Sequence, residues 1–151
     1  MRANLRKAAW MQAIATAVLT AGVATSLVVV LRRPFDADTL AIQVEALQSH
    51  AAEAALLAAL QRADQLAPGF TGEHAAQLAE SVQRTQDALA GKDADPALAS
   101  QLASARQLGA SLHARLEAWS ADGGLARSRQ FGFEALARQL GALHSQLQPG
   151  S

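Results

Sequence analysis

The side chains best suited to metal or haem chemistry in this chain are four histidines. They are His50, His74, His113 and His144. Neutral imidazole is a ligand for zinc and haem iron, and one histidine on each of four helices invites a site inside a helical bundle. At a rise of about 1.5 Å per residue, only His50 and His144 reach similar heights in such a bundle. These two form the one candidate metal pair, and no cofactor is expected.

No set of residues with the character of a catalytic site stands out. Hydrolysis or proton transfer needs a nucleophile beside a base, or paired carboxylates in one pocket. The chain has no cysteine, no Gly-rich phosphate-binding loop and no His-Glu-x-x-His motif. Its acidic residues are scattered, and Asp64, Glu80 and Glu117 are typical of solvated charges on polar faces. The sequence therefore predicts a protein that is not an enzyme.

The large aromatic residues fall near two predicted turns, which an up-and-down bundle places at the same end, or tip. Such rings can fill the open end of an alanine-rich core. They can also form a binding tip, because exposed Trp, Phe and Arg side chains anchor many protein interfaces. The candidate partner-binding residues at the tip are Phe70, Trp119, Arg127, Arg129, Phe131 and Phe133.

Apolar periodicity predicts the helices that position these residues. Ala and Leu supply most of the apolar residues and aromatics are scarce, which favours an all-α fold. Apolar spacings of three and four predict helices over residues 38–66, 72–90, 96–121 and 125–147. The predicted core stripes of the first two helices are Leu40, Val44, Leu47, Ala51, Ala54, Ala58, Ala75, Leu78, Val82 and Leu89. Those of the last two are Leu98, Leu102, Ala105, Gly109, Leu112, Leu116, Trp119, Phe133, Leu136, Leu140, Leu143 and Leu147. Expected caps are Asp36 or Asp38 for the first helix, Thr71 for the second and Asp95 for the third. Short connections then fold residues 38–148 into an up-and-down four-helix bundle.

An uncharged segment precedes the predicted bundle. Residues 8–31 carry no charged side chain, and a helix of about 24 residues reaches about 36 Å, more than the hydrocarbon layer of a bilayer at about 30 Å. We expect an uncleaved transmembrane anchor within residues 1–33, followed by a proline joint at 34–37. A cleaved signal peptide ending near Ala24 is the alternative, although cleavage there would expose the apolar run at 27–31.

Small residues in the segment predict that it packs against a second membrane helix, and the charges that flank it predict its orientation in the membrane. A stripe of small side chains lets a second membrane helix pack closely. The stripe consists of Ala13, Ala17, Ala21 and Thr25. Three basic residues before the segment outnumber Arg32 and Arg33 after it, which favours a cytoplasmic N-terminus. We therefore expect a single-pass protein of a bacterial inner membrane with its bundle in the periplasm.

The charge of the bundle excludes one class of partner. From Pro34 onward there are eight Arg or Lys against thirteen Asp or Glu, a net charge of −5. This balance disfavours phosphate backbones, so nucleic acid is not an expected partner. The sequence predicts an accessory or scaffold protein that contacts lipid through residues 8–31 and a protein partner, or a second copy, through its bundle. The alternatives are a sensory-type bundle that binds a small molecule or metal, and a secreted helical protein.

Overall fold

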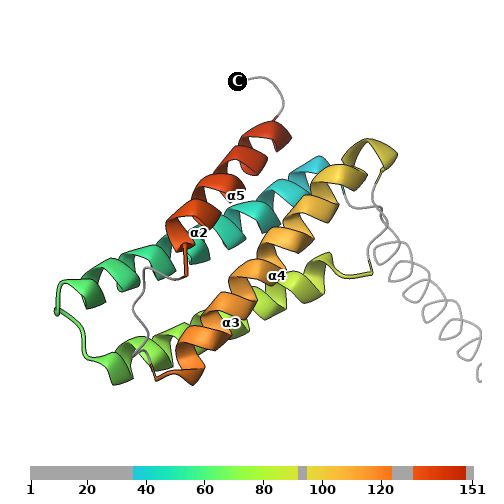
Figure 1. The fold of residues 1–151 in the computed structure, drawn as a ribbon. Helices are drawn as coiled ribbons and strands as arrows, with labels where there is room; N and C mark the ends of the chain where they lie inside the picture. Colours follow the sequence, from blue (N-terminus) through green and yellow to red (C-terminus); the bar gives the residue numbers. More distant parts are fainter. Residues whose placement is uncertain (1–35, 92–94, 124–130, 149–151) are drawn as a thin grey trace, which may run out of the picture. The chain divides into compact units, whose positions relative to one another are not determined.

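The computed structural model describes residues 36–91, 95–123 and 131–148, and outside the turns these are helical. The four α-helices are α2 (Ala37–Arg62), α3 (Pro68–Leu89), α4 (Ala99–Ala121) and α5 (Phe133–Leu147), and a 3-10 turn, η1 (Pro96–Leu98), precedes α4 (Figure 1). The all-α prediction is confirmed for this part of the chain. None of the helices in the described ranges is long and apolar enough to cross a membrane.

Several predicted features lie outside the described residues. They are the proposed membrane span at residues 8–31, its stripe of Ala13, Ala17, Ala21 and Thr25, and the tip residues Arg127 and Arg129. The structure therefore leaves these predictions as they stand.

The helices alternate in direction, as an up-and-down bundle requires (Figure 1). Arg62 at the end of α2 pairs with Glu134 at the start of α5, and His144 near the end of α5 contacts Ala41 near the start of α2. Helix α2 packs against α3 and α5, and α4 packs against the same two helices. The short connections thus lead to the antiparallel neighbours that they predict.

The turn between α2 and α3 differs from the prediction. Helix α2 ends at Arg62, short of the predicted residue 66, and Asp64 in the turn adopts a φ of 55° that interrupts the helical path. Helix α3 begins at Pro68, because proline fits the first helical turn, where its missing N–H needs no partner. Thr71 therefore lies inside α3 and caps nothing. Its hydroxyl donates a hydrogen bond to the carbonyl oxygen of Pro68 at 2.8 Å.

The other two expected caps are present. The carboxylate of Asp36 accepts a hydrogen bond from the backbone N–H of Thr39 at 2.8 Å, and that of Asp95 accepts one from Ala97 at 3.0 Å. Helix α5 begins at Phe133, after Gly132 in a left-handed conformation with φ of 58°. The predicted helix over residues 125–147 is therefore wrong at Phe131 and Gly132, which form a turn, and its predicted start at residue 125 lies outside the described residues.

The core consists of the predicted apolar stripes. The predicted stripe residues buried on α2 and α3 are Leu40, Val44, Leu47, Ala51, Ala54, Ala58, Ala75, Leu78, Val82 and Leu89. Those on α4 and α5 are Leu102, Ala105, Gly109, Leu112, Leu116, Trp119, Phe133, Leu136, Leu140, Leu143 and Leu147. Leu98 packs only at the edge, and Leu57 and Ala79 join the core beyond the prediction. Helical periodicity therefore marks burial in this chain.

Gly109 allows α4 to approach α3 and α2 closely. A Cβ atom at this position would lie 2.9 Å from Cδ of Gln86 and 3.2 Å from Cδ1 of Leu47. The side-chain amide of Gln86 occupies this space and donates a hydrogen bond to the carbonyl oxygen of Arg106 at 3.2 Å. The guanidinium of Arg106 in turn donates to the carbonyl oxygen of Leu89 at 2.7 Å, which satisfies the end of α3.

Replacing Leu112 with Ala is expected to lower the free energy of unfolding by about 2–5 kcal/mol, because this fully buried side chain would leave a cavity in a packed core. The matched control is Gln107→Ala, at an exposed position of the same helix, with an expected change of less than about 0.5 kcal/mol. Chemical denaturation followed by circular dichroism measures both. Equal losses for the two variants would contradict the assigned core.

Candidate functional site

The tip is the end of the bundle that holds the α2–α3 turn, the end of α4 and the start of α5 (Figure 1). Three of its predicted aromatic residues form one cluster there. The ring centroids of Trp119, Phe131 and Phe133 lie 5.4 to 5.9 Å apart. Trp119 is fully buried, and the two phenylalanines are at most 9% exposed. These rings close the end of the core, and they are not the exposed anchors that a binding tip requires.

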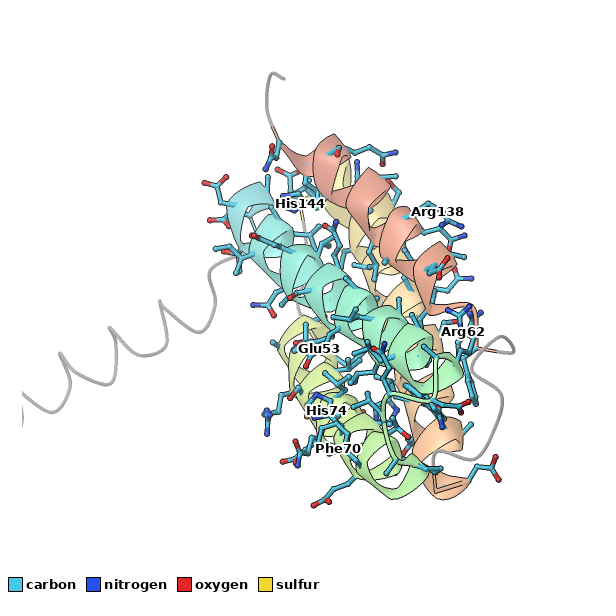
Figure 2. The ribbon with its side chains drawn as sticks, turned by 90° about the vertical axis from the view of Figure 1, so that its left-hand side faces the viewer. Glu53, Arg62, Phe70, His74, Arg138 and His144 are labelled. Atoms are coloured by element: carbon cyan, nitrogen blue, oxygen red, sulfur yellow. The ribbon has the colours of Figure 1, made fainter. Side chains whose placement is uncertain are left out.

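Phe70 stays outside this cluster. It is 51% exposed in the first turn of α3, where its ring stacks on the ring of His74 at a centroid distance of 5.8 Å. The Nε2 atom of His74 lies 2.8 Å from Oε1 of Glu53 on α2. This series of contacts ties the start of α3 to α2 and holds the phenyl ring at the surface (Figure 2). Phe70 is therefore the member of the four tip aromatics that a partner can reach.

Arg115 of α4 holds the backbone that enters α5. Its Nη1 atom donates hydrogen bonds to the carbonyl oxygens of Phe131 and, at 3.4 Å, of Gly132. A Cβ atom on Gly132 would lie 2.9 Å from the same nitrogen, so glycine also makes room for the guanidinium. Hydrogen bonds from a charged donor are stronger than neutral ones. Sequence reasoning missed Arg115, because it lies beside the α4 stripe and follows no period.

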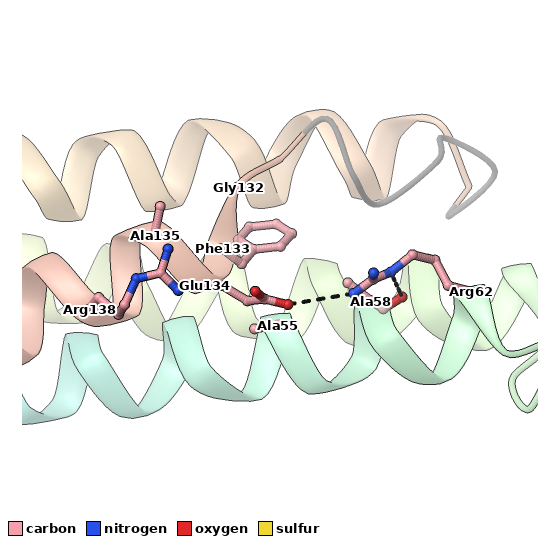
Figure 3. A pocket seen from close by; sticks show the side chains of 8 residues that line it. All are labelled: Ala55, Ala58, Arg62, Gly132, Phe133, Glu134, Ala135 and Arg138. Carbon is pink, nitrogen blue, oxygen red and sulfur yellow. Dashed lines mark hydrogen bonds and ion pairs between the residues drawn. The ribbon is translucent and has the colours of Figure 1, made fainter.

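A groove lies between the end of α2 and the start of α5, beside the aromatic cluster (Figure 3). Its volume is about 230 Å³. Ala55 and Ala58 of α2 and the ring of Phe133 give it an apolar lining. The remaining lining residues are Arg62, Gly132, Glu134, Ala135 and Arg138. The sequence offered no signal for this groove, since its walls come from two helices about 70 residues apart.

The groove carries more positive than negative charge, although the domain around it is acidic. Arg62 donates to the carbonyl oxygen of Ala58 at 3.2 Å and pairs with Glu134 at 3.6 Å. Arg138 forms no ion pair with any residue in the described ranges. The start of α5 lacks a side-chain cap, and the N-terminus of a helix carries positive partial charge. This arrangement suits a carboxylate on a binding partner.

The candidate metal pair is not brought together. The ring of His144 uses both nitrogens, because Nδ1 lies 3.3 Å from the carbonyl oxygen of Ala41 and Nε2 lies 2.9 Å from the side-chain amide of Gln148. Ala41 precedes His50 by nine residues, which is about 13 Å along α2. Within the described residues, no group of three His, Cys, Asp or Glu side chains could hold a metal ion. His50 and His144 therefore do not share a site.

The last two histidines to describe are His113 and His50. His113 contacts a carboxylate of its own helix, whereas His50 is partly buried. Nδ1 of His113 lies 3.4 Å from Oε2 of Glu117, one turn along α4. His50 is half-buried, and its Nδ1 has no hydrogen-bond partner among the residues that the structure describes. Burial lowers the pKa of His50 below its usual value of 6.5, Glu53 opposes this effect, and Arg84 adds to it.

Comparisons with known proteins leave the site to be interpreted from its own geometry. No protein-family model matches the chain, and no curated protein or solved structure matches it significantly. The described residues of the tip present an exposed ring, a guanidinium outside any ion pair, and an uncapped helix start beside a groove lined by both apolar and charged side chains. The chemistry of this arrangement suits a ligand that has an apolar part and a separate anionic group.

Arg115→Gln is expected to lower the free energy of unfolding by about 1–3 kcal/mol, because it leaves two carbonyl oxygens at the start of α5 without their charged donor. Arg84→Gln is the control, since Arg84 is exposed and pairs only with residues of its own helix. Thermal and chemical denaturation measure both variants. A loss for Arg84→Gln as large as that for Arg115→Gln would contradict the assigned role.

His50→Gln is expected to remove part of the pH dependence of stability. The pKa of His50 is lower in the folded chain than the unfolded value of 6.5, so the unfolded chain takes up the proton first as the pH falls. This contribution to stability is complete above pH 6.5, declines as the pH falls through that value, and levels off below the lowered pKa. Urea unfolding between about pH 8 and pH 5 measures the difference between the two proteins. Parallel curves would contradict the assignment.

Proposed function

We propose that this chain is a membrane-anchored accessory or scaffold protein whose helical bundle holds a protein partner by its tip, without catalysing a reaction. Residues 8–31 form its anchor, the N-terminus lies in the cytoplasm, and the bundle lies in a bacterial periplasm. The uncharged length of this segment and the excess of basic residues before it support this placement.

The groove between α2 and α5 is the observation that carries the proposed partner binding. Its apolar lining residues can contact an apolar part of a partner, and the guanidinium of Arg138 can pair with a carboxylate of the same partner. A side chain or a chain end that carries a carboxylate offers both. Arginine and aromatic residues also contribute most of the binding free energy in many interfaces. Phe70 adds an exposed ring at the same end of the bundle, on the other side of α2 from Arg138 (Figure 2).

The direction of the chain supports the use of the tip. Helix α2 begins at the end of the bundle opposite the tip, and the proposed anchor comes before α2 in the sequence. An anchor in that place leaves the tip free to meet a partner. The contacts of Trp119 with Phe133 and of Arg115 with Phe131 fix the start of α5, which forms one wall of the groove.

Crosslinking of the full-length chain in bacterial membranes, followed by mass spectrometry, tests the proposal. Wild-type protein is expected in the membrane fraction with one partner crosslinked near the tip. Arg138→Glu is expected to lower recovery of that partner about tenfold, because it places a second carboxylate in the groove. Phe70→Ala is expected to lower it to a smaller extent.

The matched control is Arg84→Glu, which makes the same charge change at an exposed position of α3 and should leave recovery unchanged. Circular dichroism should show that all variants fold. Wild-type recovery with both Arg138→Glu and Phe70→Ala would exclude the tip as the binding surface. Recovery of the wild-type chain only in the soluble fraction would exclude the anchor.

A further inference from the structure

A six-residue sequence occurs twice in the described helices. Ala-Arg-Gln-Leu-Gly-Ala occupies residues 105–110 on α4 and again residues 137–142 on α5. Glycine is a poor helix former, at about 1 kcal/mol below alanine, so helix propensity does not explain a glycine at the same place in both copies. Helix α4 packs against its antiparallel neighbour α3, and α5 packs against its antiparallel neighbour α2. Each copy of the repeat thus faces one antiparallel helix.

The glycine of each copy receives a glutamine side chain from that neighbouring helix. A Cβ atom on Gly109 would lie 2.7 Å from Nε2 of Gln86 on α3. A Cβ atom on Gly141 would lie 3.0 Å from Nε2 of Gln48 on α2. The two copies therefore pack in the same way at this position. This contact aligns α3 with α2, and it also aligns the arginines that lie three residues before each glycine.

The arginine of the first copy holds the end of a helix. Nε and Nη2 of Arg106 donate hydrogen bonds at 3.0 and 2.7 Å to the carbonyl oxygen of Leu89, the last residue of α3. The carbonyl groups in the last turn of a helix have no partner within the helix, and Arg106 supplies two donors to one of them. The side chain of Leu89 is fully buried. The first copy thus binds a helix end that finishes on an apolar residue.

The arginine of the second copy has no such acceptor. The position that corresponds to Leu89 is Ala51, three residues after Gln48 on α2. Helix α2 continues from there to Arg62, so the carbonyl oxygen of Ala51 accepts a hydrogen bond within the helix. Arg138 makes no hydrogen bond or ion pair with any described residue, and dashed lines in Figure 3 reach Arg62 but not Arg138. Its guanidinium is therefore available beside the groove.

We propose that Arg138 binds the C-terminal end of a helix in the protein partner, as Arg106 binds the end of α3, and that this helix ends the partner chain. The inference rests on the proposed function of the groove. Arg62 and Arg138 give the groove two positive charges against one negative charge from Glu134. One anionic group balances them, and the α-carboxylate of a chain that ends in a helix supplies it. The carbonyl oxygens of its last turn are acceptors of the kind that Leu89 offers to Arg106.

The size and lining of the groove suit the last residue of such a helix. At about 230 Å³ the groove is smaller than pockets for drug-sized molecules, which span roughly 300–1,000 Å³. Ala55, Ala58 and Phe133 offer apolar contacts to an apolar last side chain. A helix also brings the negative end of its dipole toward the guanidinium. An acidic side chain from the middle of a partner would supply the carboxylate alone, without the apolar contact and the dipole.

Fluorescence anisotropy with the full-length chain in detergent micelles tests the proposal. The probe is a synthetic peptide of residues 78–89, the end of α3, with a free C-terminal carboxylate and a fluorophore on its N-terminus. Arg138→Gln in the protein is expected to raise the dissociation constant of the peptide about tenfold, because the charged donor is lost. Arg84→Gln in the protein is the matched control and should leave the constant unchanged, since Arg84 is exposed and pairs within its own helix.

Two further peptides test the chain end and the helix. Replacing the C-terminal carboxylate with an amide is expected to raise the dissociation constant about fivefold, because the charge is lost. A Val82→Pro peptide cannot form a continuous helix, and its dissociation constant is expected to be about tenfold higher. Equal affinity for the acid and the amide would overturn the chain end, and equal affinity for the proline peptide would overturn the helix. Equal affinity of wild-type protein and Arg138→Gln would overturn the role of Arg138.

Failure of this inference can be distinguished from failure of the proposed function. If the peptide does not bind while Arg138→Glu still lowers recovery of the crosslinked partner, the helix end is overturned and the proposed function remains supported. Wild-type recovery of the partner with Arg138→Glu would overturn the proposed use of the groove, and with it the partner helix, even if the peptide binds.

Discussion

The bundle depends on removing four apolar stripes from water at the same time. A helix as short as α5, with its 15 residues, is marginal in water by itself and gains its stability from packing. Many of the buried positions are alanine, and each buries little area at about 25 cal/mol per Å². Close approach of the helices compensates for this, and at Gly109 a Cβ atom would require the side chain of Gln86 to move. Leucines from all four described helices, with Trp119, Phe131 and Phe133, fill the rest of the core.

The small volume of the alanine side chains also explains why aromatic residues occupy the tip. Small side chains cannot fill the end of the bundle, where helices stop and water has access. Trp119, Phe131 and Phe133 occupy that end, and Arg115 holds the turn that brings the two phenylalanines to the tryptophan. A fixed start of α5 then places Glu134 and Arg138 against α2 and forms the groove. The tip is thus both the end of the core and the surface proposed to bind a partner.

Helix α2 contributes to the core, to the groove and to the contact with α3. One face joins the core, one flank lines the groove with α5, and the other flank meets α3 through Glu53 and His74. Apolar residues are therefore distributed around much of the circumference of α2, where Ile42 and Leu56 are exposed. Phe70 is the corresponding exposed apolar side chain on α3.

The amino-acid sequence by itself determined which residues enter the core and how α2 and the turn before α4 begin. Leu40 to Ala58 on α2 and Leu102 to Trp119 on α4 follow the helical period. Asp36 caps α2, and Asp95 caps the 3-10 turn η1. Local preference was insufficient at the α2–α3 turn, where α3 begins at Pro68 and not at the predicted residue 72. Only the tertiary structure decided that the rings of Trp119, Phe131 and Phe133 contact one another, that His50 and His144 lie apart, and that Arg62 and Arg138 share a groove. Periodicity records the direction of a side chain about its own helix axis, but contacts between helices depend on their relative height and rotation, which no local pattern encodes.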